Sequence, residues 1–175
     1  EYGETAPFLY FMSHTDAELS ELVRKGRTEE FKSFGWAGEP PDPNAEATFE
    51  ASKLNWALLG EDRHRRLLGL YRELIRLRRE LPSPAARDAG EVDAWSEGWV
   101  VFLNRRLARV ETLAVWNVGA GSFTAELPPG SWTVLLDSSA QRWGGPTAGA
   151  EVAGGAVEVR ADAFVLLSRP GRGVG

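Results

Sequence analysis

The hydrophobic pattern of this sequence changes its period between residues 82 and 88, and this change limits what the chain can fold into. Before it, over residues 62–80, leucines recur at intervals of three and four positions, which is the spacing of one face of an α-helix: Leu67, Leu70, Leu74, Leu77 and Leu81. After it, short apolar runs alternate with turn-forming Gly, Pro and Ser. This second pattern predicts an antiparallel β-domain of about 85 residues.

The expected strands are short and are separated by glycine-rich or proline-rich turns. They cover residues 99–103, 113–118, 122–127, 132–136, 156–159 and 164–167. Large aromatic side chains within strands usually fill the core, so Trp99, Trp116 and Trp132 are predicted to be structural core residues. Trp143 lies in a loop flanked by Gly and Pro and is expected to be exposed.

The first 60 residues predict short helices joined by irregular connections. Thr15 to Glu18 has the sequence of a capping box, with Thr15 as the N-cap of a helix that Gly26 ends. Further short helices are expected over residues 29–32 and 47–53. The three prolines of residues 38–43 predict a loop, because proline removes backbone donors and restricts its predecessor.

The helix over residues 62–80 has a wider apolar stripe than a contact with the β-domain alone requires, because Tyr71 and Ile75 extend it. A loop-rich connection, a long outer helix and a following β-module are typical of the end of a parallel barrel. The predicted fold is therefore an α+β segment. Residues 1–84 form the last strand end, loop and helix of a catalytic (β/α)8 barrel, and residues 85–175 form an all-β antiparallel sandwich.

The composition excludes several functions. The net charge of −5 argues against nucleic acid or an anionic membrane as a partner, and no apolar run approaches 18 residues. Without cysteine and with two histidines, no thiolate or clustered His/Cys metal site is expected, and no cofactor is predicted. The chain opens at Glu1 without a leader, and its single methionine is Met12, so we expect a cytoplasmic protein from which this segment is cut.

Several motifs together resemble the malto-oligosyltrehalose trehalohydrolases, a family of the α-amylase clan. They are Glu-Tyr-Gly-Glu-Thr-Ala-Pro-Phe at residues 1–8 with Tyr10, Phe11 and His14, Lys-Gly-Arg at 25–27 with Glu30-Phe31, Phe-Gly-Trp at 34–36, Pro-Asp-Pro at 41–43, and Phe-Glu-Ala-Ser-Lys-Leu-Asn-Trp at 49–56. The leucine-rich helix matches the last barrel helix of the whole clan and is less specific. The β-domain matches only as a general C-terminal domain of the clan.

The resemblance implies a retaining glycosidase of carbohydrate metabolism. Such an enzyme cleaves the α-1,4 bond next to the trehalose end of malto-oligosyl trehalose and releases trehalose, as in trehalose biosynthesis. The family's catalytic set of two aspartates and a glutamate comes from earlier barrel strands, upstream of Glu1. No catalytic residue is therefore assigned in this segment, which is expected to be inactive by itself. Two alternatives stay open: a glycogen branching enzyme or other α-amylase-clan enzyme, and a non-catalytic carbohydrate-binding or scaffold module.

The candidate substrate-binding residues lie within the first eleven positions, where the resemblance places the mouth of the barrel. They are Glu1, Tyr2, Glu4, Phe8, Tyr10 and Phe11. Aromatic rings stack on the apolar faces of sugars, and carboxylates bind hydroxyl groups, so malto-oligosyl trehalose or maltodextrin is the expected ligand. The alternative roles are structural: the carboxylates accept N–H bonds of the loop, and the aromatic rings form a small internal core. The two histidines, His14 and His64, are expected to be a structural hydrogen-bonding residue and a surface residue.

Overall fold

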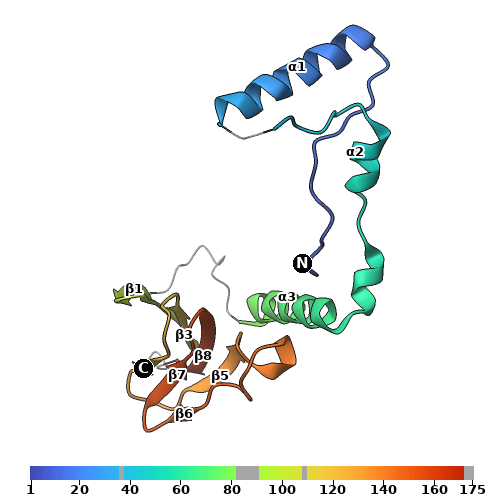
Figure 1. Cartoon of the computed structure of the whole chain (residues 1–175). Helices are drawn as coiled ribbons and strands as arrows, with labels where there is room; N and C mark the ends of the chain where they lie inside the picture. The colour runs from blue at the N-terminus through green and yellow to red at the C-terminus, as the bar shows by residue number, and fades with distance from the viewer. Residues whose placement is uncertain (36–37, 82–90, 108–109, 172–175) are drawn as a thin grey trace. The chain divides into compact units, whose positions relative to one another are not determined.

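The computed structural model describes residues 1–35, 38–81, 91–107 and 110–171. The chain divides into two compact units (Figure 1). One, here called the β-unit, contains Glu1–Tyr2 and Glu61–Gly175, and the other, the loop unit, contains Gly3–Gly60. No helix within the described ranges is long and apolar enough to cross a membrane.

Two antiparallel sheets form most of the β-unit. The larger sheet has the strand order β1-β2-β3-β8-β5, and the smaller has the order β4-β7-β6. The bounds are β1 Glu91–Glu97, β2 Val100–Leu107, β3 Val110–Asn117, β4 Phe123–Glu126, β5 Thr133–Asp137, β6 Val152–Ala153, β7 Ala156–Val159 and β8 Ala163–Pro170. All six expected strands are confirmed with ends shifted by a few residues, whereas β1 and β6 were not anticipated.

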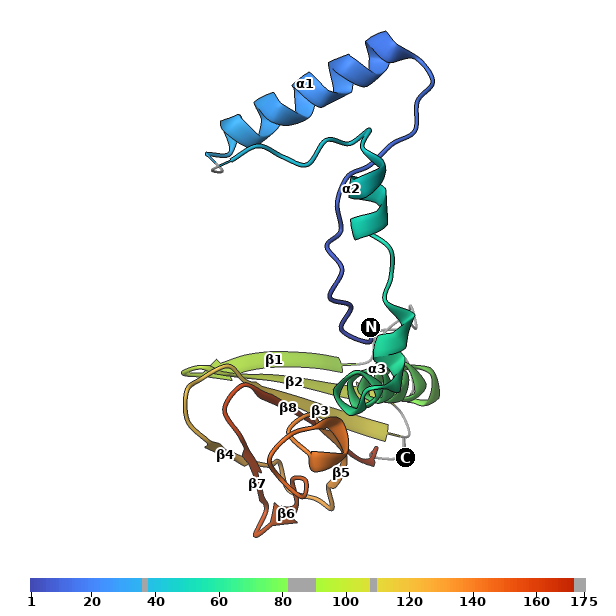
Figure 2. The same cartoon turned by 45° about the vertical axis from the view of Figure 1, so that its right-hand side comes forward.

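The two sheets share one hydrophobic core. Figure 2 shows β4, β6 and β7 on one side of the larger sheet. Phe102 of β2 faces Val115 of β3 in the register, and both are almost fully buried. Side chains of the smaller sheet, Val157 and Val159, belong to the same cluster. Because successive side chains of a strand point to opposite faces, the alternating apolar residues seen in the sequence account for this core.

The tryptophans are distributed differently from the prediction. Trp132 is buried, as expected. For Trp99 the prediction was wrong, because this residue lies in the two-residue turn between β1 and β2 and is 74% exposed. Trp116 is on the outer face of the larger sheet, where it packs against Phe164 with ring centroids 5.0 Å apart. Trp143, expected to be exposed, is half-buried.

Helix α3, Asp62–Glu80, has the predicted bounds and packs on the larger sheet. Its side chains Leu74, Leu77 and Leu81 line a small cavity of about 190 Å³ together with residues of β2, β3 and β8. Leu77 is buried there, whereas Tyr71 and Ile75 are 42% and 46% exposed. We call Tyr71 and Ile75 the uncovered face of α3. One part of the apolar stripe of this helix thus packs on the sheet, whereas the uncovered face is not buried by any of the described residues.

Within the β-unit, the short 3-10 helix η2 (Gln141–Trp143) contacts α3. Arg66 Nη1 donates a hydrogen bond of 2.9 Å to the backbone oxygen of Gln141. Gly69 allows the Trp143 ring to approach, because a Cβ at Gly69 would lie 3.3 Å from that ring. This contact with α3 explains why Trp143 is half-buried although it lies in a loop.

The loop unit contains α1 (Ala17–Ser33), α2 (Glu46–Ala51) and the 3-10 helix η1 (Trp56–Gly60). The predicted cap and end of the first helix were wrong. Asp16, not Thr15, is the N-cap, and its Oδ1 accepts from the N–H groups of Glu18 and Leu19 at 2.9 and 3.1 Å. The helix continues through Gly26 and absorbs the short helix expected over residues 29–32. A glycine inside a helix costs only about 1 kcal/mol, and i,i+3 ion pairs on both sides of it offset this cost.

Candidate functional site

The start and end of the loop unit run side by side (Figures 1 and 2), and Glu4 joins them. Glu4 Oε1 accepts from the N–H groups of Thr5 and Ala6, both at 2.8 Å, and Oε2 accepts from the N–H of Asn55 at 2.8 Å. Of the two roles considered for this carboxylate, the structure shows the accepting of loop N–H bonds. Glu4 thereby fixes the base of the loop unit.

Further along, aromatic and backbone contacts hold the same two stretches together. Phe11 and Phe49 meet edge to face, with ring centroids 5.1 Å apart and an interplanar angle of 66°. The N–H of Met12 donates to the carbonyl of Pro43 at 2.8 Å. These contacts bring residues 11–14, the first turns of α1, the loop 42–45 and the start of α2 around one cavity.

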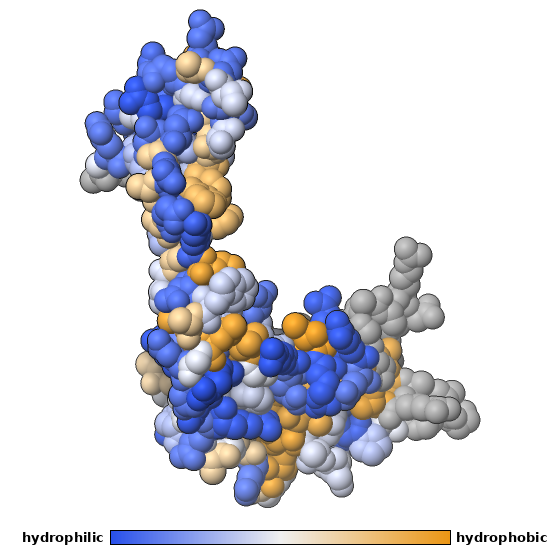
Figure 3. Space-filling view, turned by 90° about the vertical axis from the view of Figure 1, so that its right-hand side faces the viewer, coloured by the Kyte–Doolittle hydropathy of each residue, from blue (hydrophilic) through white to orange (hydrophobic). Residues whose placement is uncertain are grey.

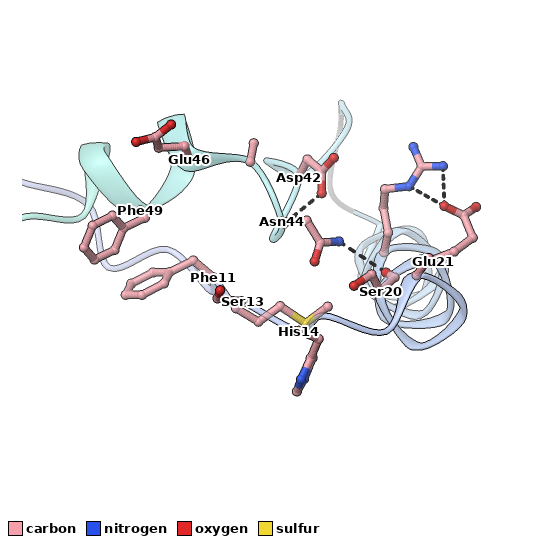
Figure 4. A pocket seen from close by; sticks show the side chains of 13 residues that line it. Phe11, Ser13, His14, Ser20, Glu21, Asp42, Asn44, Glu46 and Phe49 are labelled. Carbon is pink, nitrogen blue, oxygen red and sulfur yellow. Dashed lines mark hydrogen bonds and ion pairs between the residues drawn. The ribbon is translucent and has the colours of Figure 1, made fainter.

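This cavity has a volume of about 820 Å³ and combines apolar and polar walls. Figure 4 shows the rings of Phe11 and Phe49 at one end, and Asp42 and Asn44 toward the other. Pockets that bind small molecules usually have this combination of apolar walls with a few converging polar groups. A sugar ring has an apolar face and a rim of hydroxyl groups, so the wall chemistry is suited to a saccharide.

The polar wall is held in place by local hydrogen bonds. The N–H of Asn44 donates to Asp42 Oδ1 at 2.9 Å, and Asn44 Nδ2 donates to the backbone oxygen of Ser20 at 3.3 Å. Arg24 donates twice to Glu21 Oε2, at 2.9 and 2.7 Å. The hydrogen bond from Arg24 lowers the pKa of Glu21 below its usual value.

The predicted site residues do not gather in one place. Of the six, Phe11 alone lines the cavity. Phe8 is fully exposed, and Tyr10 is about half exposed with the Arg27 guanidinium 5.1 Å from its ring centroid. Glu1 is exposed and belongs with the buried Tyr2 to the other unit.

His64 was missed by the sequence reasoning. The expectation of a surface position was wrong, because His64 is 8% exposed and its Nδ1 lies 2.7 Å from the backbone oxygen of Tyr2. The signal was present in the sequence: His64 precedes Leu67, Leu68 and Tyr71 by three, four and seven positions, which puts it on their face of the helix. The many arginines around it hid this spacing.

Within the part of the chain that the structure describes, no three His, Asp or Glu side chains gather as a metal site requires.

Comparison with known proteins places the fold and the sequence in one class. No family model matches the chain. Among solved structures, a protein from Salmonella typhimurium described as an α-amylase superposes with a TM-score of 0.69 and 28% identity, over 97% of this chain and 27% of that one. The protein Amy13B of Eubacterium rectale shares the fold at a TM-score of 0.52 and 11% identity, over 78% of this chain and 26% of its own. The fold is thus one found in α-amylase-type glycosidases.

The sequence comparisons identify a particular family within this class. A malto-oligosyltrehalose trehalohydrolase from Rhizobium sp. is 46% identical over 158 residues, which is 78% of this chain and 26% of the relative. One from Deinococcus radiodurans is 40% identical over 121 residues, which is 68% of this chain and 20% of the relative. The chain therefore belongs to the malto-oligosyltrehalose trehalohydrolase family, as its motifs indicated, and it spans about a fifth to a quarter of the length of these two relatives.

Proposed function

We propose that this chain is the C-terminal part of a retaining glycoside hydrolase that cleaves the α-1,4 bond next to the trehalose end of malto-oligosyl trehalose and releases trehalose. The identity of 46% over 158 residues with the Rhizobium trehalohydrolase supports this proposal most strongly. The superposition on an α-amylase-type structure over nearly the whole chain supports the glycosidase class independently of that name. A cytoplasmic location is part of the proposal.

We assign residues 1–84 to the end of the catalytic (β/α)8 barrel and residues 85–175 to a C-terminal sandwich. The two apolar faces of α3 support this assignment, because one packs on the larger sheet while the uncovered face, Tyr71 and Ile75, remains exposed. The loop unit supports it too, because none of the α1 residues is buried. Exposed apolar surface of this kind marks a contact with another part of a protein. The rest of the barrel in the same chain is the proposed partner.

Much apolar surface is exposed, as Figure 3 illustrates with orange surface between blue charged groups. In the loop unit it comes from aromatic and leucine side chains: Phe8, Tyr10, Phe11, Leu22, Phe34, Phe49, Leu54 and Trp56. Some of these must be covered by the rest of the barrel, and others are free to meet substrate. For substrate contact we propose Glu1, Phe8, Tyr10 and Phe11. Glu4 acts through the loop whose N–H groups it binds, and the buried Tyr2 acts through its contact with His64 of α3.

In this proposal the reaction's carboxyl groups come from the remainder of the barrel. Retention requires one carboxylate to attack the anomeric carbon and a second carboxyl group, about 5 Å away, to protonate the leaving oxygen. The residues of this chain then hold and orient the glucan, which raises the rate by fixing the reacting atoms relative to each other.

Product analysis of the full-length protein tests the proposal. Malto-oligosyl trehalose is incubated with the protein, and the products are separated by chromatography. Free trehalose as the main product is the expected result. New α-1,6 branches or random maltodextrin fragments would assign the protein to a branching enzyme or another α-amylase-type enzyme, and binding without any product would leave a carbohydrate-binding module.

A further inference from the structure

His64 lies in the first turn of α3, and it contacts the N-terminal residues of the chain. Its Nδ1 is 2.7 Å from the backbone oxygen of Tyr2, 62 positions earlier in the chain. Both residues are buried, at 8% and 9% exposure. Figure 2 shows the N-terminus beside α3. The hydrogen bond therefore ties the residues that precede the loop unit to the helix that follows it.

The chemistry of the contact fixes the proton on one nitrogen. A backbone carbonyl only accepts, so Nδ1 carries the hydrogen that is donated to Tyr2. His64 Nε2 faces the exposed Glu61 carboxylate, with Oε2 at 3.7 Å. The neutral Nδ1–H tautomer and the imidazolium both donate from Nδ1, so the bond to Tyr2 persists whichever form is present.

The carbonyl that accepts this bond has little freedom. Tyr2 is buried, and Gly3 follows with a φ of 75°, which is a conformation that favours glycine. An alanine at position 64 would remove the His64 donor from this buried carbonyl, and buried backbone oxygens are usually hydrogen-bonded. The first two residues would then move toward solvent or another donor.

We propose that His64 is a positioning residue, which holds the buried Tyr2 against α3 and so sets where the neighbouring, exposed Glu1 meets the substrate. This inference rests on the proposed function, because it takes Glu1 as a substrate contact. It goes beyond that function by naming a residue that touches no substrate and by stating which atom is required, the Nδ1–H donor.

The test uses the full-length protein and four variants. His64→Asn retains an N–H donor on the atom bonded to Cγ, as Nδ1 is in histidine. His64→Gln places its amide one bond further out, and His64→Ala has no donor. Arg63→Ala, at the neighbouring exposed position of α3, is the matched control. Steady-state kinetics with malto-oligosyl trehalose give kcat and KM, and thermal unfolding of each variant reports its stability.

His64→Ala and His64→Gln are expected to lower kcat/KM by on the order of tenfold to a hundredfold, because a displacement of about 1 Å at a substrate contact has effects of this size. The loss should include a rise in KM, and His64→Asn should stay within about threefold of the native enzyme. A purely structural role would lower stability and leave KM unchanged in the folded enzyme. Equal kinetic effects of His64→Asn and His64→Gln would overturn the proposal.

A second measurement separates this inference from the proposed function. Amide hydrogen exchange of the peptide that covers residues 1–6 should become faster in His64→Ala and remain native-like in His64→Asn. If the native protein releases no trehalose, the proposed function fails whatever the exchange shows. If the native protein is active and neither exchange nor KM responds to His64→Ala, the inference about His64 alone is overturned.

Discussion

Replacing Glu111 with alanine should weaken the larger sheet far more than the removal of an exposed carboxylate from the same unit. Glu111 lies on β3, opposite Arg106 of β2 and Arg169 of β8 in the register. Its side chain is 3% exposed, and Arg169 Nη2 and Nε approach its Oε2 at 2.6 and 2.7 Å. Asn104 Nδ2 donates to the other oxygen at 2.8 Å. The carboxylate thus links three adjacent strands.

The expected magnitude follows from what the variant leaves behind. Arg169, with a side-chain exposure of 11%, loses its carboxylate, and removing one partner of a buried ion pair costs about 3–5 kcal/mol. Glu158→Ala provides the control. Its pair with Arg160 spans 3.5 Å between side chains that are 58% and 49% exposed, and such surface pairs contribute no more than about 1 kcal/mol.

Native-state hydrogen exchange of the intact protein, followed by mass spectrometry of peptides from β3 and β8, measures the free energy of opening of this sheet. Glu111→Ala should accelerate exchange there by on the order of a hundredfold to a thousandfold, since each 1.4 kcal/mol corresponds to about tenfold. Glu158→Ala should change it less than about fivefold. Equal exchange rates in the two variants would refute the reasoning, because the buried pair would then contribute no more than a surface pair.

Three further outcomes are expected. Burial raises the pKa of Glu111, but hydrogen bonds from Asn104 and Arg169 and the charges of Arg169 and Arg106 outweigh burial and lower this pKa overall. The resulting stability is present above the unfolded pKa of about 4.3 and is lost as the pH falls through the folded pKa. Urea midpoints should therefore drop more steeply below about pH 4 in the native protein than in Glu111→Gln. Gly145→Ala should destabilise the turn before Thr147 by more than about 2 kcal/mol, because the new Cβ would lie 1.9 Å from the backbone oxygen of Ser139. Gly121→Ala is the control, since a Cβ there meets nothing within 4 Å. Hydrogen exchange of peptides from residues 137–147 measures the difference in stability between the two variants. The 175-residue chain expressed alone should show no glycosidase activity and should aggregate through the uncovered face of α3, and a stable, active monomer in gel filtration would contradict this.

The parts of the fold that were predictable are those in which one hydrophobic period continues over many residues. The helix over about residues 62–80 was predicted, and confirmed as Asp62–Glu80, because its leucine stripe continues over four turns and ends before two prolines. The strands followed from period-two alternation and turn residues. The first strand of the β-unit was not predicted, because β1 is an edge strand with mostly exposed side chains and its sequence lacks a clear apolar pattern.

The failures concern single residues whose environment depends on tertiary contacts. Trp99 was predicted to be in a strand, but the pairing of Glu97 with Val100 places it in the turn. His64 was predicted at the surface, although its spacing places it on the face of Leu67 and Leu68. Its hydrogen-bond partner, Tyr2, lies 62 positions earlier, and no local pattern relates the two. The candidate site shows the same limit, because the motifs identified the first eleven residues while the cavity combines Phe11 with Asn44 and Phe49 from the other side of the loop unit.

The most direct test of the account compares two substrates of equal length with the full-length protein. Values of kcat/KM are measured for a malto-oligosyl trehalose and for the maltodextrin that has the same number of glucose units. A trehalose-releasing hydrolase should prefer the trehalose-ended substrate by on the order of a hundredfold or more, because a site built to hydrogen-bond the terminal disaccharide discriminates strongly against a chain that lacks it. Equal kcat/KM values for the two substrates would contradict the proposed function and leave a general α-glucan hydrolase.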